Sequence, residues 1–90
     1  MPRVRILQPL RKFTADLESI DVAGPTVAAV LENLDQQYPG FRDRLLDGSG
    51  QLKQFINIYI DGEDIRFLDG LNSIVPEKAE IMIVPAVAGG

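Results

Sequence analysis

Apolar and polar residues alternate in several stretches of the chain, and a period of two predicts half-buried β-strands. The first stretch, RVRIL at 3–7, places Val4 and Ile6 on the same face. A second stretch, LESIDV at 17–22, alternates in the same way. We expect these two strands to form an N-terminal hairpin, with residues 10–16 as the connection.

The second half of the chain predicts three more strands. QFINIYI at 54–60 alternates most clearly, and the Asp-Gly pair at 61–62 predicts a tight turn after it. A short strand is expected around 65–67, followed by a loop over 68–79. The last strand, EIMIV, is expected at 80–84.

This alternation also assigns side chains to the two faces of the expected sheet. The buried face would hold Val4, Ile6, Ile56, Ile58, Ile60, Ile81 and Ile83. The outward face would hold Arg3, Arg5, Tyr59, Met82 and Val84. Because an apolar centre with a charged rim is the usual anatomy of a protein interface, we predict a partner surface here. Its residues are Val84, Met82 and Phe67.

Residues 23–40 have the period of an amphipathic helix instead. Apolar residues that recur every three or four positions line one face for burial, namely Val27, Val30, Leu31, Leu34 and Tyr38. Pro25 suits the first helical turn, and Pro39-Gly40 ends the helix. Residues 41–47 are expected to add one helical turn before a flexible connection at 48–50.

The expected order is therefore strand, strand, helix, strand, short strand, strand. One amphipathic helix covers only one face of a sheet, and a right-handed crossover places the final strand beside the first, parallel to it. This is an α+β, β-grasp (ubiquitin-like) arrangement with a mixed sheet of four to five strands. We expect residues 1–85 to form this domain and 86–90 a flexible C-terminal tail.

Composition and charge narrow the function. The 90 residues include no cysteine and no histidine, which removes thiolate chemistry and the usual general base near neutral pH. The net charge of −4 argues against nucleic-acid binding, and no apolar run approaches the roughly 20 residues of a membrane helix. DGED at 61–64 lacks the spacing of a calcium loop. We predict a cytoplasmic protein without catalytic residues, metal site, nucleic-acid partner or membrane partner.

The chain ends in AVAGG, a segment with little side-chain bulk. Gly89 and Gly90 have no Cβ, so their backbone fits a narrow channel and takes unusual dihedral angles. Burying the slim, uncharged residues Ala86, Val87 and Ala88 there costs little. Five extended residues reach roughly 16 Å. We predict that Ala86, Val87, Ala88 and Gly89 occupy a partner's channel and that the Gly90 carboxylate is the group that is modified.

Two segments, FINIYIDGEDIRF at 55–67 and IVPAVAGG at 83–90, carry a family resemblance. With the expected fold, they make the chain resemble the ubiquitin-like sulfur carriers of the MoaD/ThiS type over essentially its whole length. MoaD-like chains typically end in Pro-Pro-Val-x-Gly-Gly, and Ala86 in place of the second proline favours the CysO-like carriers of cysteine biosynthesis. PEKAE at 76–80 departs from the Gly-Asp turn often found in the family.

The resemblance implies a chemistry for Gly90. An E1-like adenylyltransferase of the MoeB/ThiF type would use ATP to adenylate the carboxylate, and a sulfur donor would replace AMP to leave a thiocarboxylate. No cofactor would be bound by the chain itself. The sulfur acceptor would be a cysteine-synthase-like enzyme or, as second choice, the molybdopterin-synthase large subunit. A metalloprotease would release cysteine in the first case.

The sequence is also compatible with two other functions. In one, activated Gly90 is joined to lysines of other proteins, which makes the chain a ubiquitin-like modifier. In the other, the chain is a non-covalent β-grasp adaptor whose carboxylate is inert. Deletion of Gly90 would leave the adaptor function intact and abolish the other two.

Overall fold

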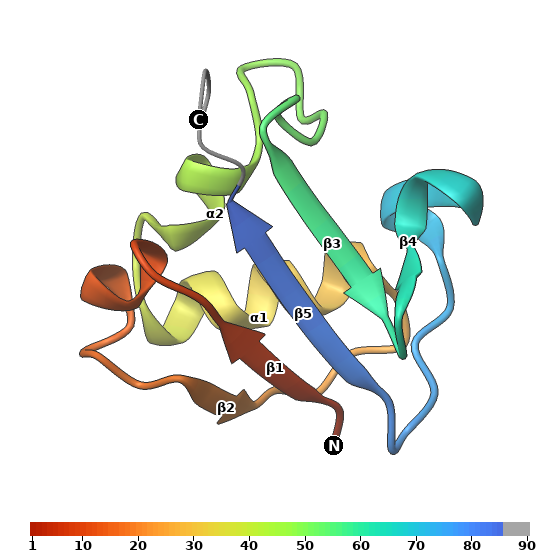
Figure 1. Ribbon diagram of the computed structural model, residues 1–90, viewed down its shortest axis with the longest axis horizontal. Helices are drawn as coiled ribbons and strands as arrows, with labels where there is room; N and C mark the ends of the chain where they lie inside the picture. Colours follow the sequence, from red (N-terminus) through yellow and green to blue (C-terminus); the bar gives the residue numbers. More distant parts are fainter. Residues whose placement is uncertain (86–90) are drawn as a thin grey trace.

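Five strands form one mixed sheet in the order β2-β1-β5-β3-β4 in the computed structural model, which describes residues 1–85 (Figure 1). The strands are β1 (Arg3–Ile6), β2 (Ser19–Asp21), β3 (Ile56–Ile60), β4 (Glu63–Asp64) and β5 (Glu80–Pro85). The predicted tail, residues 86–90, lies outside the described residues.

The register confirms the predicted topology. Strands β1 and β2 form the antiparallel N-terminal hairpin, with Val4 opposite Ile20. Strand β5 then lies parallel to β1, with Ile81 beside Val4, and antiparallel to β3, with Ile83 opposite Ile58. The last strand is therefore in the middle of the sheet, as expected for the β-grasp fold.

One long helix, α1 (Val27–Gln37), crosses a single face of the sheet (Figure 1). It begins after Thr26, whose side-chain oxygen accepts the backbone N–H of Ala29 at 3.2 Å and so satisfies a free donor of the first turn. The short helix α2 (Phe41–Leu45) follows directly and confirms the predicted further turn. Gly40 joins the two helices with a φ of +94°, which favours glycine.

The core lies between α1 and the sheet. Every side chain that the strand pattern assigned to the buried face is buried: Val4, Ile6, Ile56, Ile58, Ile60, Ile81 and Ile83. The helix contributes Val27, Val30, Leu31 and Leu34, while Tyr38 is only partly buried and packs at the edge of this core. The two apolar patterns thus meet in one cluster, which fixes the register of β5 between β1 and β3.

The prediction of a short strand around 65–67 is wrong. Strand β4 contains only Glu63 and Asp64, and Ile65–Phe67 form a 3-10 helix, η2. The Asp64 carboxylate accepts the backbone N–H of Arg66 at 2.9 Å and caps this turn. Ile65 is buried in the core. A local hydrogen bond and one buried anchor therefore replace continued strand pairing.

The long loop predicted over 68–79 contains another 3-10 helix, η3 (Gly70–Asn72), and is fastened to the start of α1. The N–H of Val75 donates to the carbonyl of Pro25 at 2.9 Å, and the N–H of Val27 donates to that of Ser73 at 3.1 Å. The chain thus enters β5 from a fixed position.

Candidate functional site

The sheet face opposite α1 carries a row of side chains that crosses four strands. The register places Arg5, Met82, Tyr59 and Asp64 side by side on β1, β5, β3 and β4. Met82 and Tyr59 are half-buried. Nη1 of Arg5 lies 3.8 Å from a carboxylate oxygen of Glu80. The row therefore has an apolar centre and charged ends, as the sequence predicted.

Val84 lies on the same face, nearer the end of β5, and pairs with Asn57 of β3. The Asn57 side-chain oxygen accepts a hydrogen bond from Arg66 at 2.6 Å. The Arg66 guanidinium also donates to the carbonyl oxygens of Lys53 at 3.1 Å and Ile56 at 2.7 Å. Arg66 thus fastens η2 to the beginning of β3, beside the pair of Asn57 and Val84.

Phe67 follows Arg66 in η2 and is 87% exposed, more than any other large apolar side chain among residues 1–85. Its neighbour Leu68 is 43% exposed. Strand β3 separates η2 from β5, which carries Met82 and Val84. The structure therefore brings Met82 and Val84 together and places Phe67 at a separate apolar point beyond β3.

Phe55, which the sequence reasoning did not include in the interface, is 51% exposed and precedes β3. The next residue, Ile56, pairs with Pro85, so Phe55 stands near the end of β5. The alternation in QFINIYI already placed Phe55 on the outward face with Asn57. Its position beside the end of β5 depends on the register between two strands, which the pattern of one strand does not reveal.

Strand β5 remains paired up to its last residue, because Pro85 lies opposite Ile56. The predicted tail residues begin at the next position: Ala86, Val87, Ala88, Gly89 and Gly90. They lie outside the described residues, so their roles remain predictions. The central strand of the sheet therefore leads directly into the segment that the sequence analysis assigned to the chemistry.

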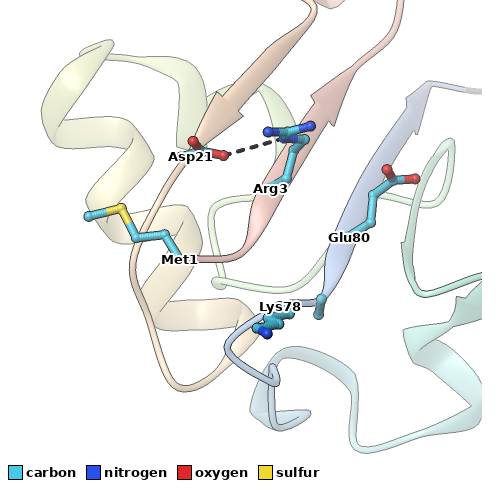
Figure 2. A pocket seen from close by; sticks show the side chains of 6 residues that line it. Met1, Arg3, Asp21, Lys78 and Glu80 are labelled. Atoms are coloured by element: carbon cyan, nitrogen blue, oxygen red, sulfur yellow. Dashed lines mark hydrogen bonds and ion pairs between the residues drawn. The ribbon is translucent and has the colours of Figure 1, made fainter.

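A hollow of the described surface lies at the opposite end of the sheet (Figure 2). It has a volume of about 310 Å³ and is lined by Met1, Arg3, Asp21, Lys78, Ala79 and Glu80. The Arg3 guanidinium bonds the Asp21 carboxylate across it at 3.4 Å. Because it adjoins the beginning of β5 rather than Pro85, this hollow is not part of the candidate site.

Two structural features are absent from residues 1–85. Within that range, no group of three or more aspartate, glutamate, histidine or cysteine residues is placed to hold a metal ion. No helix in the same range has the length and apolar character needed to cross a membrane.

Comparison with known proteins gives a consistent result. The model of the ThiS family matches residues 4–90. The sulfur carrier protein CysO of Mycobacterium tuberculosis is 41% identical over 83 residues, which cover 90% of this chain and 89% of that protein.

Solved structures show the same likeness. A chain in the crystal structure of the Amycolatopsis orientalis BexX/CysO complex matches with a TM-score of 0.94 and 34% identity, and the match covers all of both chains. The solution structure of small archaeal modifier protein 1 from Methanosarcina acetivorans matches with a TM-score of 0.85 and 29% identity. That match covers 99% of this chain and 95% of the archaeal protein.

Proposed function

Because this chain belongs to the ThiS family of ubiquitin-like sulfur carriers, we propose that it carries sulfur as a thiocarboxylate on Gly90. The observation that supports this most directly is the position of β5. It is the central strand of the sheet, it is paired to Pro85, and AVAGG follows immediately in the sequence. The fold thus holds the body rigidly up to the residue where the reactive segment begins.

The proposed chemistry follows from the weakness of a carboxylate as an electrophile. An E1-like enzyme joins the Gly90 carboxylate to AMP with ATP as co-substrate, and pyrophosphate leaves. A hydrosulfide equivalent from a sulfur donor then attacks the acyl carbon, AMP leaves, and a thiocarboxylate remains. The chain is the substrate of its partner enzymes in these steps and supplies no catalytic group of its own.

The outward face offers the body a place to dock while the tail is in a partner's channel. Met82 and Val84 lie on the strand that leads into the tail, and a partner that covers them lies beside the channel entrance. Phe67 adds a separate, highly exposed contact point. The partners we propose are an E1-like adenylyltransferase and a sulfur-accepting synthase.

Among acceptors, we propose a cysteine-synthase-like enzyme, with the molybdopterin-synthase large subunit as second choice. The likeness to the CysO sulfur carrier of M. tuberculosis supports the first. With such a synthase, the thiocarboxylate sulfur attacks the β-carbon of an activated serine derivative and displaces its leaving group, which gives a thioester between Gly90 and cysteine. The acyl group then moves from sulfur to the cysteine amine, and a metalloprotease hydrolyses the resulting amide to release cysteine and restore the Gly90 carboxylate.

Intact-mass measurement of the protein from its native host tests the proposal. We expect a species that is heavier by the sulfur-for-oxygen difference, located at Gly90 and consumed by a reagent that alkylates thiocarboxylates. A variant lacking Gly90 is the control and should show no such species. If the host protein carries only a plain carboxylate, and an E1-like enzyme with ATP leaves it unchanged, the carrier function is wrong and an adaptor function takes its place.

A second candidate function is protein modification, which the similarity to the Methanosarcina small archaeal modifier protein favours. It uses the same activated Gly90 but transfers it to a lysine amine. Digestion of host proteins and a search for peptides branched at lysine through Gly90 separates the two. Branched peptides would support the modifier, and a thiocarboxylate without them would support the carrier alone.

A further inference from the structure

Two cations share one aromatic ring at the end of the sheet where β5 stops. The ring belongs to Phe13, in the 3-10 helix η1 (Leu10–Phe13), and packs against the core. The guanidinium carbon of Arg44, in α2, lies 4.3 Å from the ring centroid, and Nζ of Lys12 lies 5.2 Å from it. Both distances are within the roughly 6 Å of a cation–π contact. Phe13 and Arg44 are 31 positions apart in sequence and thus belong to one cluster in the fold.

This cluster lies at the end of the sheet from which the tail leaves. Strands β1 and β5 are parallel and paired through Ile6 and Ile83, so both end on the same side. η1 follows β1 after a short connection. The last residue of α2, Leu45, accepts the backbone N–H of Lys53 at 2.9 Å, just before the β3 residue that pairs with Pro85.

The cations near this end are largely without carboxylate partners. Of the ion pairs formed within residues 1–85, none includes Lys12, Arg42, Arg44 or Lys53. Two nearby carboxylates are occupied locally: Asp35 accepts backbone N–H groups of residues 40 and 42, and Asp47 accepts from residues 49 and 51. Two exposed carboxylates in this part of the structure, Asp16 after η1 and Asp43 of α2, have no such bond. In a chain of net charge −4, Lys12 and Arg44 therefore present positive charge without an ion-pair partner near the end of β5.

The segment that carries Lys12 and Phe13 is held in place. Nε of Arg11 donates to the carbonyl of Ile6 at 2.8 Å, and the buried Thr14 hydroxyl lies 3.2 and 3.0 Å from the carbonyl oxygens of Arg11 and Leu17. A surface that is already ordered loses less entropy when a partner binds.

We propose that the cluster of Lys12, Phe13 and Arg44 docks against an acidic surface beside the tail channel of the E1-like activating enzyme. The inference rests on the proposed function, since that enzyme must bring Gly90 into its active site. Carboxylates on the enzyme complement the unpaired cations and orient the approaching carrier so that its C-terminal end faces the enzyme. The Phe13 ring keeps both cations oriented before contact.

Charge reversal at one position tests the inference against a matched control. Arg44→Glu and Lys78→Glu change the net charge equally, and neither native cation takes part in an ion pair of residues 1–85. Lys78 lies at the opposite end of the sheet, in the hollow of Figure 2. The measurement is ATP-dependent pyrophosphate release by the host's E1-like enzyme, as kcat/KM for the carrier at increasing NaCl.

We expect Arg44→Glu to lower kcat/KM roughly ten-fold at low salt, mainly through KM, and Lys78→Glu to change it by less than about two-fold. Added salt should reduce the difference in kcat/KM between wild type and Arg44→Glu, because screening weakens a contact between charges. Arg44→Gln should show a smaller loss in the same direction, and it replaces Arg44→Glu as the test if that variant melts early.

Equal losses in the Arg44 and Lys78 variants would reduce the effect to net charge and overturn the docking site. The docking site would also be overturned if Arg44→Glu and Arg44→Gln were adenylated as efficiently as the wild-type chain. If the enzyme does not adenylate the wild-type chain at all, the proposed function itself fails, and this outcome differs from the other two.

Discussion

At the scale of single residues, Gly24 is fixed by a close approach that the sequence does not reveal. A Cβ built there would lie 2.7 Å from the backbone nitrogen of Val30, 2.8 Å from its Cγ2 and 3.0 Å from the carbonyl carbon of Ala29. Most of these neighbours are the backbone of α1 itself and cannot rotate away. The hydrophobic pattern predicted α1 and its buried face correctly, but it treats all glycines near a helix start alike.

We therefore expect Gly24→Ala to lower the free energy of unfolding by about 1–3 kcal/mol, the usual cost of an overpacked contact. The measurement is urea denaturation followed by circular dichroism. Gly48→Ala is the matched control, because a Cβ at Gly48 meets nothing within 4 Å. An unchanged midpoint for Gly24→Ala would show that the connection between β2 and α1 moves away from the helix easily and would contradict this account.

At the scale of elements, long patterns were predictable and short capped turns were not. The alternation of five or more residues identified β3 and β5, and the three-to-four-residue spacing identified α1. The 3-10 helix at Ile65–Phe67 depends instead on one capping carboxylate, Asp64, and on the Arg66 side chain that reaches back to β3. These are contacts of single atoms, so a hydropathy pattern carries no trace of them.

The loop between α2 and β3 is another such element. Asp47 there accepts hydrogen bonds from the Ser49 hydroxyl at 2.7 Å and from the backbone N–H groups of Ser49 at 2.9 Å and Gln51 at 3.0 Å. The Ser49 hydroxyl, the two N–H groups and the positive charge of Lys53 hold the pKa of the Asp47 carboxyl below its ordinary value. The folded state thus favours the charged form.

A carboxyl whose pKa is lowered by folding stabilises the folded state. This contribution is complete at pH values above the pKa of the unfolded state, about 3.9, and is lost as the pH falls through the pKa of the folded state. We expect Asp47→Asn, which keeps an acceptor oxygen but no charge, to melt below wild type at pH 7. The difference should close under strong acid. Asp69→Asn is the control, because the Asp69 side chain does not cap η3. A melting difference for Asp47→Asn that stays constant with pH would contradict this account.

At the scale of the whole molecule, the sheet holds the chain up to Pro85, and the segment that we propose to react begins at the next residue. The sequence sufficed for the topology, because one amphipathic helix and a parallel last strand leave few alternatives. It also identified Met82 and Val84 as neighbours on the outward face. It could not place Phe67, Phe55 or the Phe13 ring relative to the end of β5, since each position depends on how distant segments pack.

This arrangement has a consequence for a chain shortened by Gly90. It keeps the proposed docking surfaces, but its terminal carboxylate is displaced by one residue, so we expect it to inhibit activation of the wild-type chain competitively. Its inhibition constant should lie within about ten-fold of the wild-type KM, because most of the contact area belongs to the body. The measurement is pyrophosphate release at several concentrations of both chains.

Adding Phe67→Ala to the shortened chain isolates the contribution of the separate apolar point beyond β3. The Phe67 ring is 87% exposed, so its loss should leave the melting temperature unchanged, whereas inhibition should weaken roughly ten-fold if the ring contacts the enzyme. Ile74→Ala, which removes another side chain with 77% exposure, is the control and should not weaken inhibition. If the shortened chain does not inhibit at concentrations far above the wild-type KM, binding resides in the tail alone. The outward face would then have no part in recognition by the activating enzyme.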